Sequence, residues 1–187
     1  GYAELETIYR QNTQWMRDAS LDLARGRVGK ALAAYRHHGH VMGSELKAQA
    51  VSALIDDWSR DYDPAKSTLI LAHLRRDVRA LNDMARATLV SRGIVGTGHA
   101  FRTEDGERRF AAGDQIVFLR NEGSLGVKNG MIGRVIEAAP GRFTADVGEG
   151  SHRRRVAVDQ RFYRNVDHGY ATTIHKAQGA TVDRVKV

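Results

Sequence analysis

The feature that most constrains the fold is a short, unbroken and largely apolar run at residues 68–72, Thr-Leu-Ile-Leu-Ala, with polar residues on both sides. A strand that is apolar along its whole length is typical of a parallel sheet covered on both faces by helices. Apolar side chains recur at helical spacing on both sides of this run: before it at Leu46, Ala50, Leu54 and Trp58, and after it at Val78, Leu81, Ala85 and Leu89. Helix, strand and helix in this order predict an α/β domain with a mostly parallel sheet.

A second strand-to-helix passage lies at residues 168–179, HGYATTIHKAQG. Apolar and β-branched residues lead there into two Thr hydroxyls, a His-Lys pair, a Gln and a Gly. The N-terminus of a helix offers free N–H groups and the positive end of the helix dipole, which suit a phosphate. On spacing alone, a phosphate-binding turn and an ordinary turn with a solvated lysine explain this stretch about equally well.

Two arginines follow the apolar run closely. Ligands of parallel sheets bind at the carboxyl ends of the strands, and Arg75 and Arg76 come directly after residues 68–72. We therefore expect them at the same edge of the sheet as the polar residues of 168–179. Solvated surface charges explain the two arginines nearly as well.

The character of the sequence changes after Gly98: helical periodicity stops and glycines accumulate. Short strand-like segments follow between Gly-rich turns, at residues 101–110 as a hairpin, then at 115–120, 131–137, 142–147 and 152–158. Such a series suggests a small antiparallel β-barrel. It is an insert, because the α/β pattern resumes afterwards. We expect residues 1–98 and 166–187 to form the α/β domain and residues 99–165 the barrel.

The insert carries candidate contacts for a nucleic acid. Phe118 or Phe143 could stack on bases, and Lys128 and the run Arg153-Arg154-Arg155 could line a DNA path. Strand alternation places Arg153 and Arg155 on one face and Arg154 on the other. A solvated edge strand explains the arginine run equally well.

Composition narrows the function classes. Across 187 residues, 29 Lys+Arg face 22 Asp+Glu, a net charge of +7, and most of the cations are Arg, which prefers planar partners such as phosphate. There is no Cys, so disulfides and thiolate metal sites are excluded, which fits a cytoplasmic location. No apolar run approaches the roughly 20 residues of a membrane span. His37, His38 and His40 lack a carboxylate or Cys to complete a metal site.

Several motifs resemble those of one family. YATTIHKAQG resembles motif V, Y-A-x-T-x-H-K-[SA]-Q-G, of RecD-like superfamily 1 DNA helicases, and Tyr9-Arg10-Gln11 resembles their motif IV. Residues 113–117, 120–121 and 129–133 resemble the G-D-x-V…N…N-G-x-x-G signature of the barrel inserted in those helicases. Within this group, AHLRRDVRALN, GDQIVFLRNEGSLGVKNGMIGRV and VDHGYATTIHKAQGATVDRVKV resemble the helicase half of Ti-type conjugative relaxases, the TraA group.

The resemblance implies a fold and a nucleotide site. The α/β domain would be the second RecA-like domain of a helicase, and the insert would have the small Src-homology-type barrel fold. Arg10 would act as an arginine finger on ATP held by the preceding domain, so Arg10 is the expected catalytic residue. The residues expected near the nucleotide are Arg10, Gln11, Gln178 and Gly179.

The resemblance also implies a DNA site. The residues expected to touch the phosphates of single-stranded DNA are Thr172, Thr173, His175 and Lys176 of motif V, together with Arg75, Arg76 and Lys128. Asn82 stands where RecD-like chains carry an Asn in the helix after the apolar strand. No metal ligand is expected among these 187 residues.

The sequence lacks the phosphate loop G-x-x-x-x-G-K-[ST] and the relaxase Tyr with its His cluster. It starts at Gly1 and stops at Val187 within an apparent strand. We therefore expect a C-terminally truncated fragment of an ATP-dependent helicase, inactive by itself, with ATP and Mg²⁺ held mainly by the preceding domain. Its expected partners are single-stranded DNA, that domain and type IV secretion components. The alternative is a non-catalytic helicase-like module that serves as a translocation signal or docking site for such a secretion system.

Overall fold

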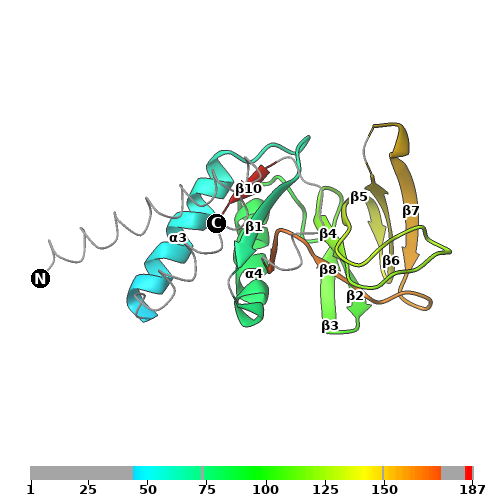
Figure 1. The fold of residues 1–187 in the computed structure, drawn as a ribbon, viewed down its shortest axis with the longest axis horizontal. Helices are drawn as coiled ribbons and strands as arrows, with labels where there is room; N and C mark the ends of the chain where they lie inside the picture. The colour runs from blue at the N-terminus through cyan, green and yellow to red at the C-terminus, as the bar shows by residue number, and fades with distance from the viewer. Residues whose placement is uncertain (1–43, 73, 149, 174–183, 187) are drawn as a thin grey trace, which may run out of the picture.

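The computed structural model describes residues 44–72, 74–148, 150–173 and 184–186 (Figure 1). The elements expected before residue 44 lie outside these described residues. So do the expected site residues Arg10, Gln11, His175, Lys176, Gln178 and Gly179, and the histidines at positions 37, 38 and 40.

The first part of the described chain is an α/β unit. Its elements are the helices α3 (Ser44–Arg60) and α4 (Arg75–Ser91) and the strands β1 (Thr68–Ala72), β9 (Ala171–Thr173) and β10 (Arg184–Lys186). The strands form a parallel three-stranded sheet in the order β10-β1-β9. The parallel sheet that the sequence predicts is therefore confirmed.

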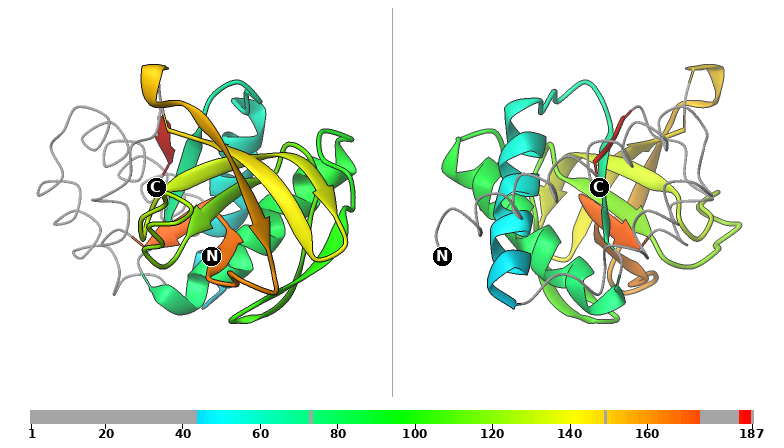
Figure 2. Two further views of the ribbon diagram at one scale, coloured as in Figure 1. Left: turned by 90° about the vertical axis from the view of Figure 1, so that its right-hand side faces the viewer. Right: turned by 60° about the vertical axis from the view of Figure 1, so that its left-hand side comes forward.

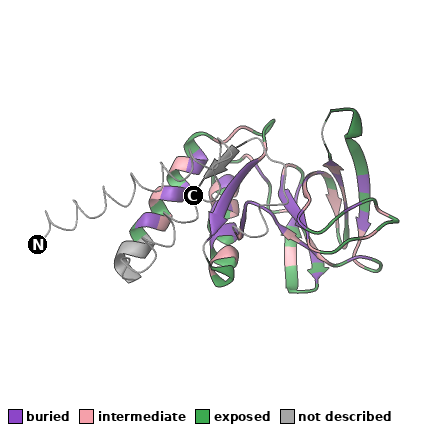
Figure 3. Ribbon diagram, viewed as in Figure 1, coloured by how far each residue is buried: buried purple, intermediate pink, exposed green. Residues whose placement is uncertain are grey.

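The apolar run forms the centre of this sheet. All of its residues are buried, and Figure 3 shows β1 as a continuous buried strand. α4 contacts β1, β9 and α3, and its buried side chains lie on one face: Leu81, Asn82, Ala85 and Leu89. Trp58 of α3 is fully buried, with its ring centroid 5.7 Å from that of Tyr170 in an edge-on arrangement. Burial of each large apolar side chain contributes about 1.5–3 kcal/mol, so this shared core fixes both helices against the sheet.

The second part is built from antiparallel strands. Its elements are the hairpin β2 (His99–Thr103) and β3 (Gly106–Phe110), then β4 (Gln115–Phe118), β5 (Ile132–Ala139), β6 (Arg142–Val147), the 3₁₀ helix η1 (Gly150–His152), β7 (Arg154–Asp159) and β8 (Val166–His168). Five of these strands form one sheet in the order β7-β6-β5-β4-β8. Figure 2 shows how strongly the strands of this sheet curve.

The hairpin closes over the curved sheet without joining it strand to strand. Among the described residues, the pair β2–β3 and the five-stranded sheet share no ladder, so a fully closed barrel is not shown. Single backbone bonds connect them: Gly141 N–H to the Ala100 carbonyl at 2.8 Å and Glu104 N–H to the Arg164 carbonyl at 2.9 Å. The two sheets also share one apolar core.

That core contains the two aromatic residues expected to stack on bases. Phe118 is fully buried and Phe143 is 3% exposed. The ring centroid of Phe143 lies 5.3 Å from that of Phe101 and 5.1 Å from that of Phe110. The expectation of base stacking by Phe118 or Phe143 is therefore wrong: alternation along short strands hides which of their faces turns inward.

The insert and the α/β unit meet at the amino ends of the parallel strands. β8 starts at Val166, where we expected the α/β domain to resume, but it pairs with β4 of the insert. After His168 the chain needs only Gly169 and Tyr170 to reach β9. The insert sheet and the strand that carries the motif V threonines are therefore almost continuous in sequence.

Candidate functional site

The carboxyl edge of the parallel sheet brings together four of the expected site residues. In the register of β1 and β9, Leu71 aligns with Thr172 and Ala72 with Thr173. Arg75 and Arg76 are the first two residues of α4, which begins three positions after Ala72, the last residue of β1. Two threonines and two arginines that lie far apart in sequence therefore share one edge.

Their accessibility differs. Arg75 and Arg76 are exposed, Thr173 is half-buried and Thr172 is buried, with only 4% of its surface accessible. The N-cap residue of α4 is Leu74, which makes no side-chain capping bond to the first turn. A helix start with an apolar cap and two exposed cations favours an anion, because both the dipole and the charges attract it. Of these threonines, Thr173 is the more accessible to solvent.

Asn82 fixes the start of the strand that leads to this edge. Its side-chain oxygen accepts the backbone N–H groups of Tyr170 and Ala171, both at 2.9 Å, and its NH₂ group donates to the Ala171 carbonyl at 3.2 Å. Asn82 is 2% exposed. A buried amide satisfied in this way makes the helix α4 and the strand β9 one unit.

Asp114 is a fully buried carboxylate at the junction of the two parts. It accepts the Arg86 guanidinium at 3.0–3.2 Å, the Ala111 N–H at 2.8 Å and the Tyr170 hydroxyl. Burial, followed by the negative charge of Asp114, raises the pKa of Tyr170 well above its usual value. Tyr170 therefore stays protonated and donates to Asp114, while Arg86 balances the charge.

Gln115 connects three backbone segments next to this carboxylate. Its side-chain NH₂ donates to the carbonyls of Thr68 at 3.0 Å and Gly169 at 2.8 Å, and its backbone carbonyl accepts the Gly169 N–H at 2.8 Å. A Cβ on Gly169 would lie 2.5 Å from the Ile116 carbonyl carbon, so only glycine permits this approach. We call Asn82, Arg86, Asp114, Gln115 and Tyr170 the junction network.

Sequence reasoning missed the roles of Arg86, Asp114, Gln115 and Tyr170. The available signal was the Gly113-Asp114-Gln115 stretch, which the resemblance had singled out as part of the barrel signature. A carboxylate directly before a fully buried strand needs a partner, because an unpaired buried charge is strongly unfavourable. Sequence alone could not identify that partner, because Arg86 and Tyr170 lie 28 and 56 residues away.

Further polar contacts tie the insert to the α/β unit on both sides of this network. The Arg134 guanidinium of β5 donates to the Tyr62 hydroxyl and the Lys66 carbonyl, both at 3.0 Å. Asp167 of β8 pairs with Arg108 at 3.0 Å and with Arg79 of α4 at 3.6 Å. The insert is therefore held against the α/β unit from two directions.

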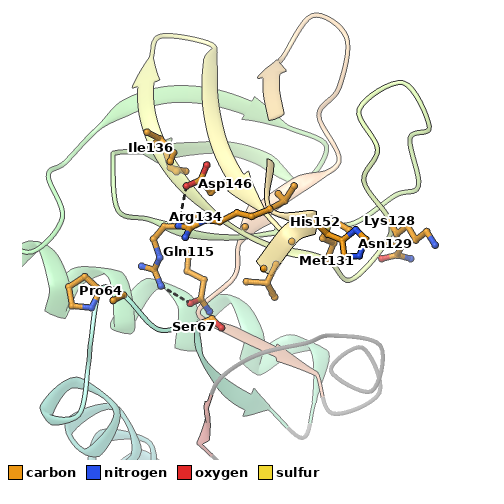
Figure 4. A pocket seen from close by; sticks show the side chains of 18 residues that line it. Pro64, Ser67, Gln115, Lys128, Asn129, Met131, Arg134, Ile136, Asp146 and His152 are labelled. Carbon is orange, nitrogen blue, oxygen red and sulfur yellow. Dashed lines mark hydrogen bonds and ion pairs between the residues drawn. The ribbon is translucent and has the colours of Figure 1, made fainter. Parts of the chain in front are cut away.

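Lys128 lies elsewhere. It is exposed and lines a hollow of about 890 Å³ between the insert and the segment before β1, together with Pro64 and Ser67 (Figure 4). This hollow is near the amino end of β1, whereas Arg75 and Arg76 follow its carboxyl end. Among the described residues, the structure therefore does not bring Lys128 together with the expected DNA contacts at the carboxyl edge.

The arginine run at the start of β7, residues 153–155, divides as alternation predicts. Arg153 and Arg155 both pair with Asp146, at 3.3 and 3.6 Å, while Arg154 donates to the Gly126 carbonyl. All three side chains remain exposed. Within the described ranges, no group of three or more His, Asp or Glu side chains is placed to hold a metal ion. In the same ranges, no helix is both long and apolar enough to span a bilayer.

Comparison of the sequence with known proteins shows the family of the chain. All 187 residues match the probable conjugal transfer protein TraA of Sinorhizobium fredii at 72% identity and the conjugal transfer protein TraA of Agrobacterium fabrum at 72% identity. The chain belongs to the TraA conjugal transfer proteins. It spans 17% of the length of these curated relatives. A family profile described as an AAA domain matches residues 1–46.

Solved structures give weaker likenesses. Unliganded Pif1 from Bacteroides sp. aligns at 20% identity and a TM-score of 0.45, covering 68% of this chain and 47% of Pif1. The Bacteroides Pif1 helicase in complex with ADP-AlF₃ and ssDNA aligns at 17% identity and a TM-score of 0.45, covering 74% of this chain and 38% of that one. Similarity at this level does not transfer roles to individual residues of the TraA segment.

Proposed function

We propose that the segment is the second RecA-like motor domain of an ATP-dependent single-strand DNA translocase within a conjugal transfer protein. Residues 1–98 and 166–187 would form this domain, and residues 99–165 its inserted Src-homology-type barrel. One observation carries the proposal: the parallel sheet places Arg75, Arg76 and Thr173 at one carboxyl edge of a chain from the TraA proteins. Ligands of open parallel sheets bind at this edge.

The DNA contacts would go to phosphates. Arg75 and Arg76 supply charge at the start of α4, Thr173 a hydroxyl, and the remaining motif V residues Thr172, His175 and Lys176 would extend the same site. Such contacts bind without sequence preference, and the affinity falls steeply as salt rises, because each neutralised phosphate releases counterions. Lys128 lies near the other end of β1, so it would touch a different part of the DNA strand.

The nucleotide would be shared with the preceding domain. Arg10 and Gln11 of motif IV, and Gln178 and Gly179 of motif V, are the proposed contacts from this segment, and all lie outside the described residues. ATP hydrolysis, with Mg²⁺ bound mainly by that preceding domain, would supply the free energy for movement. The chain's own part in the cycle is to hold the strand at the carboxyl edge and to complete the cleft with Arg10.

The junction network gives this segment a mechanical property. Asn82 and Asp114 fix Tyr170 through its backbone and its hydroxyl, and Tyr170 directly precedes the motif V threonines. A displacement of β9, the strand of the motif V threonines, would therefore carry the insert with it as a rigid body. This coupling would make the insert follow each shift of the grip on DNA.

The test uses a chimera in which these 187 residues replace the matching segment of Agrobacterium fabrum TraA. ATP hydrolysis is measured with and without single-stranded DNA. We expect DNA to stimulate turnover, Arg10→Ala to abolish turnover at unchanged DNA affinity, and Lys176→Ala to weaken DNA binding. Arg60→Ala is the matched control, because Arg60 is an exposed arginine at the end of α3, before the amino end of β1.

A chimera that binds ATP and DNA but shows no DNA-stimulated turnover would contradict the motor. The segment would then fit the second candidate, a non-catalytic module that serves as a translocation signal for a type IV secretion system. Retained secretion of the chimera through such a system, with ATP turnover lost, would separate the two functions.

A further inference from the structure

Phe162 is the most exposed large apolar side chain in the described part of the chain. It is 83% exposed, whereas Leu74 and Met84 reach 37% and 36%. The other phenylalanines of the insert, at positions 101, 110, 118 and 143, are all at most 3% exposed. An exposed aromatic ring forgoes the favourable free energy of apolar burial. A ligand that covers the ring would gain that free energy.

The turn that carries Phe162 is tightly held. The Phe162 and Tyr163 N–H groups both donate to the Asp159 carbonyl, at 3.0 and 2.9 Å. The Asp159 carboxylate accepts the Arg161 backbone N–H at 2.9 Å and its guanidinium at 2.8–3.2 Å. These Arg161 bonds lower the pKa of Asp159 to about 2, so the carboxylate stays charged at neutral pH. Tyr163 anchors the turn from below: it is buried, and its hydroxyl donates to the Arg120 carbonyl at 2.7 Å.

One cation lies against the ring, and two further arginines belong to the same turn or to the strand next to it. The Arg161 guanidinium carbon lies 5.3 Å from the centroid of the Phe162 ring, within cation–π distance. Arg164 follows two residues later and pairs with Glu104 at 3.5 Å, and Arg142 lies opposite Asp159 in the register of β6 and β7. Arg142, Arg161 and Arg164 are all exposed.

The residues around Phe162 favour a nucleobase, and not an apolar protein surface, as the ligand of the ring. A protein partner that docks by burial needs a contiguous apolar patch, but the residues around Phe162 in the turn are Asp159, Gln160, Arg161 and Arg164. An unpaired base needs only one accessible ring and cations for its flanking phosphates. A firmly held Phe with Arg161 at its ring and Arg164 two residues further along the turn meets both requirements.

We propose that Phe162 is a stacking platform for an unpaired base of single-stranded DNA, with Arg161 and Arg164 beside the neighbouring phosphates. This inference rests on the proposed function and adds a second DNA contact, on the insert, to the one at the carboxyl edge of the sheet. It also assigns the stacking role that Phe118 and Phe143, buried in the core, cannot fill.

The experiment measures binding of the chimera to an oligothymidylate that carries a single 2-aminopurine. We expect the base fluorescence to be quenched in the wild type and the quenching to be lost in Phe162→Ala. Affinity should fall about fivefold to a hundredfold, the range for removing one stacking aromatic residue. Phe162→Trp should retain both signals. The slope of affinity against salt should not change in Phe162→Ala, because every phosphate contact is kept. Met84→Ala is the matched control for removal of an exposed apolar side chain.

The outcomes separate this inference from the function on which it rests. If Phe162→Ala binds like the wild type while Arg75→Ala/Arg76→Ala binds weakly, the stacking platform is overturned and the proposed function stands. If the wild-type chimera binds no single-stranded DNA, both fail. If Phe162→Ala lowers the melting temperature of the chimera without changing DNA affinity, Phe162 packs against another part of the same protein and the inference is overturned.

Discussion

The two ends of the parallel strands carry polar residues of opposite character. At the amino ends, Asp114 and Gln115 are at most 1% exposed, and their side chains bind protein groups. At the carboxyl ends, Arg75 and Arg76 are exposed. Both ends matched the same helicase resemblance, yet Asp114 and Gln115 are engaged inside the protein, whereas Arg75 and Arg76 offer charge to a ligand. Burial and bond partners therefore separate a polar residue that builds the molecule from one that is available for binding.

This contrast follows from topology. The insert leaves the α/β unit after α4 and returns just before β9, so the insert packs against the amino ends of the strands and not against their carboxyl edge. Covering an edge requires that every buried backbone and side-chain group there find a partner. The junction network supplies partners for several of these groups, whereas the Thr68 hydroxyl and His168 Nδ1 have none among the described residues.

The largest expected effect comes from breaking the covered end. Asp114→Ala leaves the Arg86 guanidinium and the Tyr170 hydroxyl without their buried acceptor. Removing one member of a buried ion pair typically destabilises a protein by about 3–5 kcal/mol. We expect a decrease of this size in the free energy of unfolding of the 187-residue chain, measured by urea denaturation.

The control for that experiment is Asp83→Ala. Asp83 also pairs with an arginine, Arg79, at 3.1 Å, but the side chains are 51% and 44% exposed. Exposed pairs contribute less than about 1 kcal/mol, so this variant should unfold near the wild-type midpoint. Equal destabilisation of the two variants would mean that burial does not distinguish the two carboxylates, and the contrast between the covered and open ends would fail.

The same contrast explains what the sequence could predict. The parallel sheet was predictable because β1 is short and apolar throughout, and a strand of this kind has few alternatives. The change from helices to short strands was visible from the end of helical periodicity after Gly98, and the first of these strands, β2, starts at His99. Those signals are local in sequence, so they survive without knowledge of the three-dimensional structure.

The residues that sequence reasoning misjudged depend on distant partners. Phe143 was considered for stacking, but its environment is set by Phe101 and Phe110 of another sheet. Lys128 was grouped with the motif V residues, but the insert carries it to the other end of β1. Phe162 lies outside every motif and periodic segment of the sequence, so no pattern distinguished it from the four buried phenylalanines. Exposure is decided by packing between segments, which a linear pattern does not contain.

A smaller effect of the opposite kind is expected at the open end. Arg75→Ala/Arg76→Ala should leave the free energy of unfolding within about 0.5 kcal/mol of the wild type, because exposed substitutions seldom do more. Affinity for single-stranded DNA should fall, and the slope of log affinity against log salt should become shallower by about 1.4, or about 0.7 for each phosphate that is no longer neutralised. Binding titrations of the chimera at several salt concentrations measure both quantities.

Arg60→Ala serves again as the matched arginine, at the end of α3. Arg60→Ala should change both the salt slope and the affinity less than either Arg75→Ala or Arg76→Ala does alone. If the salt slope were unchanged in Arg75→Ala/Arg76→Ala, the DNA would not contact these two arginines. The carboxyl edge would then not be the DNA site, and the contrast between the two ends would fail.

The smallest expected effect is a pH dependence of stability at the covered end. His168, at the covered end, is 4% exposed; its Nε2–H donates to the Arg109 carbonyl at 2.7 Å, and its Nδ1 has no partner. Burial lowers the pKa of His168, against the raising effects of the Arg109 carbonyl and the nearby Asp114 and Asp167; Arg86 adds to the lowering. Because the folded pKa lies below the unfolded value of 6.5, the unfolded chain takes up this proton first as the pH falls.

The free energy of unfolding should therefore decrease as the pH falls below about 6.5, by at most about 1.4 kcal/mol per pH unit for one proton, and the decrease should end at the folded pKa. Urea denaturation between pH 8 and pH 5.5 measures it. His168→Gln, which cannot titrate, should show a flatter profile, whereas His99→Gln, at an exposed position, should keep the wild-type slope. If His168→Gln and the wild type lose stability in parallel, protonation at the covered end contributes nothing, and the buried imidazole must be accommodated in both charge states.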